Sequence, residues 1–219
     1  MKQIALDIAQ PPAPTLDNFV PGRNAELVVA LYSAANGSGE RFIYLWGAPG
    51  SGRSHLLRAA VDAVQSGGKP AMMFDPRAAQ FDAPDDALCA ADDVDALDAD
   101  AQIALFNLHN RISAGHGALL ASGNAPPAQL ALRADLVTRL ASGLVYQVHG
   151  LNEDEKVAAL RRHAQARGFR LPQDVVAYLL RHAQRDLPSL LALLDALDRY
   201  SLATRRAVTL PLLRELLNN

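Results

Sequence analysis

Short apolar runs alternate with helical repeats along the first two thirds of the chain. Each run is four or five residues long, which is typical of strands buried in a parallel sheet. Between the runs, leucine, valine and alanine recur every three or four positions, as on the buried face of a helix. The alternation predicts an α/β domain of three layers with a parallel five-stranded sheet. Strands are expected at 42–46, 71–74, 87–91, 118–122 and 144–148, and helices at 26–35, 55–66 and 102–112.

From Leu151 onward the apolar spacing is helical throughout. Asn152 and the three acidic residues after it supply a cap and a first turn for a helix that ends near Arg167. Further helices are expected from 171, over 187–200 and from 209. We therefore expect an α/β domain at residues 15–150 and a small all-α domain at 151–219.

Composition narrows the class of protein. Half of the 219 residues are hydrophobic, 20% are charged and the net charge is -2, so the chain is globular and no general affinity for nucleic acid is implied. The one cysteine, Cys89, lies in an apolar run and is expected to be a small buried hydrophobe. We find no signal peptide and no apolar stretch long enough to span a bilayer, so a cytoplasmic protein is expected.

Residues 47–54 carry the strongest chemical signal. They read Gly-Ala-Pro-Gly-Ser-Gly-Arg-Ser between an apolar strand and a helix, the context of a phosphate-binding P-loop. Glycines let backbone N–H groups converge on phosphate oxygens, and the helix adds the positive end of its dipole. Ser54 stands where a hydroxyl would bind Mg²⁺. The alternative is an ordinary Gly- and Ser-rich βα turn, which the flanking strand and helix disfavour.

Arg53 occupies the position of the usual P-loop lysine. Its planar guanidinium still neutralises phosphate, but it is bulkier than an ammonium and does not act as a point charge. The substitution favours nucleotide binding over nucleotide hydrolysis.

Asp92 and Asp93 end the apolar run at 87–91. Downstream of a P-loop, this pattern predicts that Asp92 holds Mg²⁺ through its water shell and that Asp93 occupies the place of a water-activating acid. Aspartate is one methylene shorter than the glutamate often found there. The alternative is a solvated turn rich in aspartate.

Two polar residues follow the next apolar run. Asn124 lies at the carboxyl end of the strand predicted at 118–122, where ligands bind in such sheets. Asn124 is expected to contact either the γ-phosphate or the attacking water. The alternative is that it only forms a turn ahead of two prolines. Arg139 either projects toward the nucleotide of a neighbouring subunit or is an ordinary arginine on a helix surface.

The first 14 residues form a separate segment with three prolines near its end. Gln3, Leu6 and Ile8 resemble the peptide by which bacterial proteins dock on the replication sliding clamp, with the amide at a pocket rim and two apolar side chains in a cleft. Because apolar residues alternate here, an added edge strand is the alternative. Residues 1–14 are therefore a candidate clamp-binding peptide and linker.

The P-loop, the paired acids, Asn124, Arg139 and the helical C-terminal part together resemble the AAA+ ATPases, whose helical part is a lid. Within them the chain is similar to the DnaA-related branch, and the likeness covers nearly the whole chain. It rests on local stretches at 19–24, 52–57, 167–169 and 194–199.

The resemblance implies a role for each matching residue. Arg139 would be an arginine finger, with Asp93 and Asn124 as the other catalytic candidates. Pro188 stands in place of the usual arginine of the sensor-two region. ADP or ATP with Mg²⁺ is the implied ligand, the metal held by Ser54 and Asp92. The implied nucleotide-binding residues are Phe19, Val20, Gly47, Gly50, Ser51, Gly52, Arg53, Ser54 and His55.

The resemblance also implies a function, the negative regulation of replication initiation. A clamp-tethered, nucleotide-bound protein of this kind would stimulate ATP hydrolysis by the initiator DnaA. The implied partners are DnaA and the sliding clamp, without sequence-specific DNA binding or a membrane, and self-association is left open. The alternatives are a self-contained ATPase, such as a helicase loader of the DnaC kind, and a nucleotide-stabilised scaffold.

Overall fold

The computed structural model describes residues 13–74, 83–182 and 186–217. Its contacts divide the chain into a unit formed by Pro14–Gly150 and a second unit that contains the helices from Leu151 onward.

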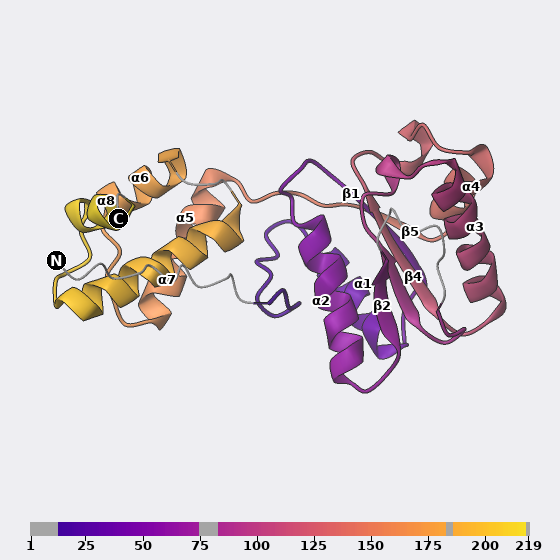
Figure 1. Ribbon diagram of the computed structural model, residues 1–219, viewed down its shortest axis with the longest axis horizontal. Coiled ribbons are helices and arrows are strands. Elements are labelled where there is room, and N and C mark those ends of the chain that lie inside the picture. Colours follow the sequence, from indigo (N-terminus) through magenta and orange to yellow (C-terminus); the bar gives the residue numbers. More distant parts are fainter. Residues whose placement is uncertain (1–12, 75–82, 183–185, 218–219) are drawn as a thin grey trace. The chain divides into compact units, whose positions relative to one another are not determined.

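The first unit is built on a parallel five-stranded sheet with the strand order β2-β3-β4-β1-β5 (Figure 1). Because every strand is parallel, all the carboxyl ends lie at one edge, and the loops that follow the strands meet there. This confirms the predicted fold class. The strands are β1 Phe42–Trp46, β2 Ala71–Phe74, β3 Leu88–Ala91, β4 Ala118–Gly123 and β5 Leu144–Gln147.

Helices cover both faces of the sheet (Figure 1). Ile43 and Leu45 of β1 point toward α1 and α2, whereas Tyr44 points toward α3 and α4, because side chains alternate along a strand. All three are buried, which explains why β1 is an unbroken apolar run. The helices of this unit are α1 Ala25–Asn36, α2 Arg53–Ser66, α3 Ala99–Ala114 and α4 Ala134–Leu140, with short 3-10 turns at Val94–Ala96 and Pro127–Gln129.

Two helices begin earlier than their apolar repeats indicate. Helix α2 begins at Arg53, inside the P-loop motif, and not at His55. Helix α3 begins at Ala99 and not at Gln102, because the Asp98 carboxylate accepts a hydrogen bond of 2.9 Å from the N–H of Ala101. In α3 a cap, and not an apolar residue, therefore sets the helix start.

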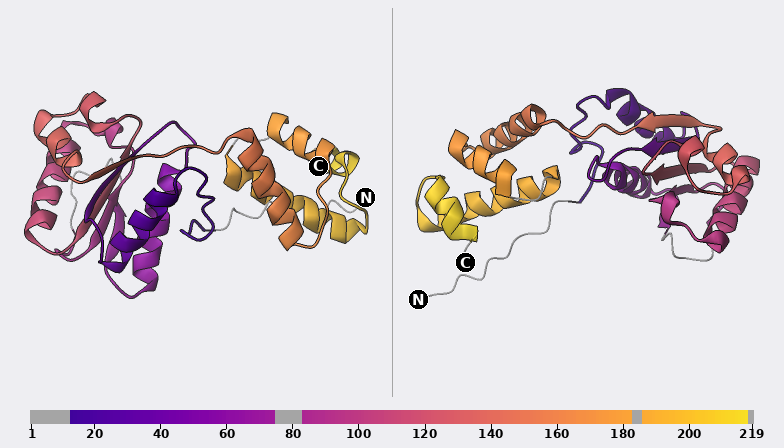
Figure 2. Two further views of the ribbon diagram at one scale, coloured as in Figure 1. Left: turned by 180° about the vertical axis from the view of Figure 1, so that it is seen from behind. Right: turned by 90° about the horizontal axis from the view of Figure 1, so that it is seen from above.

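The second unit is entirely helical among the residues described (Figure 2). Leucines, valines and alanines of its four helices form a separate apolar core. Asn152 and Glu155 cap the first helix reciprocally, each side chain bonding the other's backbone N–H at 2.8 Å. The helices are α5 Glu153–Ala166, α6 Gln173–His182, α7 Leu187–Thr204 and α8 Leu210–Leu217.

Charged groups tie α5 to α7. Arg167, just after α5, donates to the buried Asp198 carboxylate at 2.8 Å and lies 3.3 Å from Asp195. His163 contacts Asp195 at 2.7 Å. Asp198 is buried only because it is paired, since an unpartnered carboxylate would be costly at this depth.

In the ranges described, no helix combines the length and the apolar character needed to cross a bilayer.

Candidate functional site

The P-loop connects β1 to α2 at the carboxyl edge of the sheet. A side chain at Gly47 would place its Cβ 2.5 Å from the carbonyl oxygen of Val148, so only glycine fits there. Gly50 and Gly52 have φ values of +76° and +107°, a region that glycine adopts without strain. Among described residues, the buried Ser51 hydroxyl has no hydrogen-bond partner.

The segment before α1 packs against the start of α2. A Cβ on Gly52 would lie only 2.8 Å from Cε2 of the Phe19 ring, and the centroid of this ring is 5.5 Å from that of His55. His55 Nε2 lies 3.0 Å from the carbonyl oxygen of Thr15. Phe19 and His55 thus lie beside the P-loop, and Val20 is half-buried. Their contact with adenine stays a prediction.

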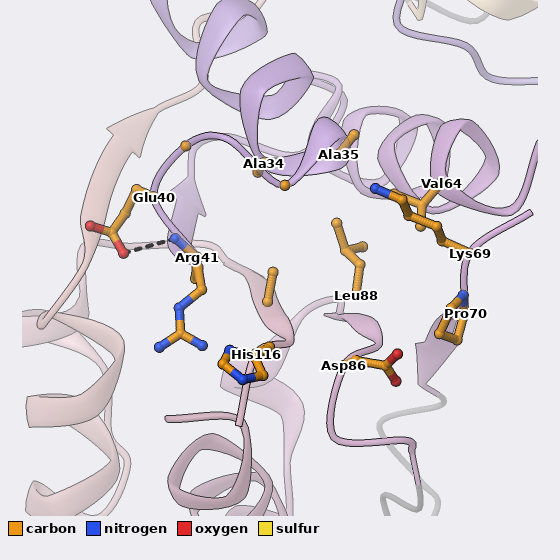
Figure 3. Close-up of a pocket in the computed structure, with 13 residues that line it drawn as sticks. Ala34, Ala35, Glu40, Arg41, Val64, Lys69, Pro70, Asp86, Leu88 and His116 are labelled. Carbon is orange, nitrogen blue, oxygen red and sulfur yellow. Dashed lines mark hydrogen bonds between the residues drawn. The ribbon is translucent and has the colours of Figure 1, made fainter. Parts of the chain in front are cut away.

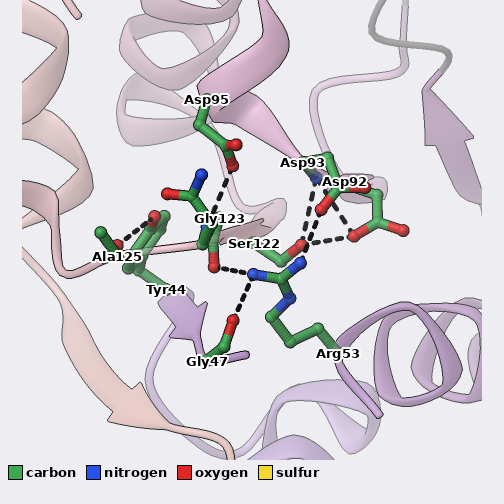
Figure 4. Close-up of polar contacts among 10 residues, drawn as sticks. Tyr44, Gly47, Arg53, Asp92, Asp93, Asp95, Ser122, Gly123 and Ala125 are labelled. Carbon is green, nitrogen blue, oxygen red and sulfur yellow. Dashed lines mark hydrogen bonds and ion pairs between the residues drawn. The ribbon is translucent and has the colours of Figure 1, made fainter. Parts of the chain in front are cut away.

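The Arg53 side chain points into the protein, and its guanidinium donates three hydrogen bonds (Figure 4). Its Nη1 donates to the carbonyl oxygens of Gly47, at 2.7 Å, and of Gly123. Its Nη2 donates to Asp93 Oδ1 at 2.9 Å, and the Arg53 side chain is only 10% exposed. The guanidinium therefore joins the P-loop, the end of β3 and the end of β4 into one polar cluster.

Asp92 and Asp93 have different hydrogen-bond partners, although they are adjacent in the sequence (Figure 4). Asp92 Oδ1 accepts from the hydroxyl of Ser122 and, at 3.1 Å, from the N–H of Asp93. Asp93 has a left-handed φ of 47°, which costs strain and is typical of functional sites. Burial raises the pKa of Asp93, and the charges of Asp92 and Asp95 raise it further against the opposing effect of Arg53.

Three residues that organise this edge were not predicted from the sequence. Ser122, fully buried at the end of β4, links Asp92 to the backbone of Asp93. The buried Tyr44 hydroxyl donates to the carbonyl of Ala125 at 2.9 Å, and burial raises the pKa of this tyrosine. Asp95 Oδ1 accepts from the N–H of Asn124 at 3.0 Å. Ser122 carried a signal, a polar residue ending an apolar strand, and Tyr44 and Asp95 carried none.

No group of three or more histidine, cysteine or carboxylate side chains in the part of the chain described is arranged to hold a metal. Asp92 and Ser54 fit Mg²⁺ only as an ion that nucleotide phosphates also bind, which is the usual arrangement for this metal. The assignment of Mg²⁺ to these two residues stays a prediction.

None of the bonds around Arg53 involves Arg139. Arg139 lies in the last turn of α4 with an exposed side chain. Pro188 lies in the first turn of α7, where proline is tolerated because no N–H is needed. Gln3, Leu6 and Ile8 lie outside the described residues.

A separate cavity of about 270 Å³ lies at the opposite, amino edge of the sheet (Figure 3). Its floor is apolar, with Ala34, Val64 and Leu88, and its rim carries Lys69 and Asp86, which are exposed. It is remote from the loops that follow the strands and contributes nothing to the cluster around Arg53.

The lowered pKa values of two histidines in the α/β unit predict that the protein is less stable in acid. Burial lowers the pKa of His55 and of His109 below the ordinary value of 6.5, and the charge of Arg139 lowers that of His109 further. Each histidine therefore binds a proton more readily after unfolding. The contribution of the neutral rings to the free energy of unfolding is present above pH 6.5 and is lost as the pH falls through that value. We expect the melting temperature to fall between about pH 7 and about pH 5, and to fall less in His109→Phe. Parallel pH curves for the two proteins would contradict this.

Several solved structures have a fold similar to that of this chain. Domain III of the replication initiation protein DnaA from Thermotoga maritima matches with a TM-score of 0.71 and 20% identity, over 96% of this chain and 98% of that one. AMPPCP-bound DnaA from Aquifex aeolicus matches with a TM-score of 0.67 and 19% identity, over 90% and 71%. RuvB from Thermotoga maritima, a Holliday junction branch migration motor, matches with a TM-score of 0.65 and 13% identity, over 94% and 71%.

At these identities the likeness establishes the fold, and the chain has the AAA+ architecture found in DnaA: a P-loop α/β domain and a helical lid. The lid narrows the assignment, because residues 153–217 match the family model described as Hda, lid domain. The helical part of the chain is therefore similar to the lid of the Hda family, and the chain as a whole has the fold of DnaA domain III.

Proposed function

We propose that this protein negatively regulates replication initiation by binding nucleotide, docking on the sliding clamp and stimulating ATP hydrolysis by DnaA. The observation that carries the proposal is an exposed arginine, Arg139, at the end of α4 of a DnaA-type AAA+ domain whose lid matches the Hda family. The test is ATP hydrolysis by DnaA in the presence of this protein.

Nucleotide binding is supported by the P-loop itself. Two loop glycines adopt positive φ, and the buried Ser51 hydroxyl lacks a partner among the residues described, as a group that binds a ligand would. The N-terminus of α2 adds its dipole at the same place. We propose ADP or ATP as the ligand, with Phe19 and His55 beside the base.

The alternative of a self-contained ATPase is less well supported. Arg53 already donates to two carbonyl oxygens and to Asp93, so it is poorly placed to follow charge that develops on a γ-phosphoryl group. Asp93, the candidate for activating water, is held in the same ion pair. We infer weak intrinsic hydrolysis, with the nucleotide serving as a structural ligand.

Arg139 fits a role in trans because it belongs to a different part of the unit from the P-loop cluster. It is exposed, and none of the bonds around Arg53 involves it. A fixed guanidinium of this kind stabilises the charge on a partner's phosphoryl group in the transition state. We propose that this partner is ATP-bound DnaA.

Clamp docking through the first residues is a separate prediction. Gln3→Ala combined with Leu6→Ala should remove the amide and one apolar anchor, and a small peptide interface depends on a few such anchors. We expect a binding loss of at least about tenfold, measured by surface plasmon resonance on immobilised clamp. Lys2→Ala with Asp7→Ala is the matched control and should bind normally. Equal affinity of the Gln3, Leu6 variant and the parent would return this segment to the edge-strand interpretation.

A further inference from the structure

The guanidinium of Arg139 lies over an aromatic ring of the neighbouring helix. Its Cζ is 5.7 Å from the centroid of the Phe106 ring on α3. A cation within about 6 Å of a ring centroid is attracted by the negative face of the ring. Arg139 is exposed, but its charged end therefore has a preferred position on the protein surface.

Helix α3 presents a stripe of three residues at helical spacing, Gln102, Phe106 and His109, and two of them engage α4 directly. Gln102 Oε1 accepts a hydrogen bond of 3.0 Å from the N–H of Arg133, immediately before α4, while Phe106 lies under Arg139 in its last turn. Leu136, fully buried, packs α4 into the same core as α3. Both ends of α4 are thus fixed against one face of α3.

His109, the third residue of the stripe, is an unusual core residue. It is 4% exposed and stacks on Phe42 of β1, with ring centroids 4.3 Å apart and an interplanar angle of 29°. Neither of its ring nitrogens has a hydrogen-bond partner among the residues described, and a buried unpartnered imidazole costs stability. Burial and the nearby charge of Arg139 both lower the pKa of His109, which favours a neutral ring beside the cation.

We propose that Phe106 and His109 are positioning residues for Arg139: Phe106 seats the guanidinium, and the His109 ring, wedged against Phe42, holds α3 in the register that places Phe106 under it. The inference rests on the proposed function, in which Arg139 acts on a partner's nucleotide. An arginine has many rotamers, and a seat that selects one of them reduces the freedom lost when the finger docks.

The seat is testable in the protein alone. A ring above a guanidinium shifts the NMR signal of the Arg139 Nε–Hε group by its ring current. We expect this shift to be lost in Phe106→Leu, which keeps apolar volume, and to be kept in Phe106→Tyr, which keeps the ring. His109→Ala should move the signal and His109→Phe should leave it. Arg41, whose Cζ is 5.6 Å from the Phe42 centroid, provides an internal control for the Phe106 variants. An Arg139 signal unchanged in Phe106→Leu would overturn the seat.

The catalytic consequence is measured with DnaA. Phe106→Leu should lower the stimulated kcat by about two- to fivefold, the range expected from losing an exposed cation–π contact, and leave the KM for DnaA unchanged. Phe106→Tyr should restore kcat. A change in KM alone would show that Phe106 binds the partner directly and would overturn the positioning role. If the parent protein does not stimulate DnaA, the proposed function fails, and the NMR shift alone then decides whether the seat exists.

Discussion

Replacing Arg139 with alanine is expected to abolish the stimulation of ATP hydrolysis by DnaA. An arginine finger puts fixed positive charge on oxygens that become more negative as the γ-phosphoryl leaves, and its loss costs roughly three to five orders of magnitude in well-studied GTPases. Arg139→Lys should recover little, because an ammonium lacks the planar pair of donors. The measurement is hydrolysis of DnaA-bound ATP at saturating concentrations of this protein and of DNA-loaded clamp.

Arg133 provides the matched control. It is an exposed arginine just before the same helix, paired at 2.7 Å with Asp135, so Arg133→Ala removes an equal charge close to Arg139. We expect it to stimulate DnaA like the parent. Arg139→Ala should still fold, bind nucleotide and bind clamp, since its proposed target is a partner's site. A variant that retains all three properties and full stimulation would refute the finger assignment.

Replacing Gly47 with alanine is expected to remove nucleotide-dependent stabilisation. The new Cβ would stand 2.5 Å from the backbone carbonyl oxygen of Val148 and 3.0 Å from Ser51 Oγ, so the loop must move away from β5. The parent should gain about 2.7 kcal/mol in the free energy of unfolding at a ligand concentration 100 times the dissociation constant. We expect most of this gain to vanish in Gly47→Ala, measured as the shift of the melting temperature with ADP or ATP and Mg²⁺.

Gly68→Ala separates the loss of the ligand from a general loss of stability. Gly68 lies after α2, has a φ of +73°, and a Cβ there would meet nothing within 4 Å. The substitution should cost about 1 kcal/mol through the left-handed backbone alone. Its nucleotide-dependent shift should equal that of the parent. If the parent itself shows no shift with ADP or ATP, the site does not bind nucleotide.

Much of the fold follows from local pattern. Strands β1, β2 and β3 are continuous apolar runs, and β4 is one up to Ser122, so their composition marks them as strands of a covered sheet. The edge strand β5 is less clearly marked, because it ends in Gln147 and exposes Leu144 and Val145. The strand order is not local information, because the pairing of β1 with both β4 and β5 depends on how the crossovers pack. Helix α3 begins earlier than its apolar repeat indicates, because the Asp98 cap sets the start of the helix.

The motif residues of the candidate site were predictable from the sequence, but the network of bonds that joins them was not. The P-loop and the acids are contiguous motifs, whereas Arg53 reaches Asp93 and Gly123 from 40 and 70 positions away. These residues come together only because β4 lies between β3 and the P-loop strand β1. Ser122 carried only the signal of a polar residue that ends an apolar strand, and its role follows from the hydrogen bond of its hydroxyl to Asp92.

The most direct test of the proposed function is ATP hydrolysis by DnaA, with and without this protein and with and without DNA-loaded clamp. We predict rapid conversion of DnaA-bound ATP to ADP only when this protein and loaded clamp are both present, and little turnover by this protein alone. Substantial ATP turnover by the isolated protein, together with no effect on DnaA, would contradict the proposal and would favour a self-contained ATPase.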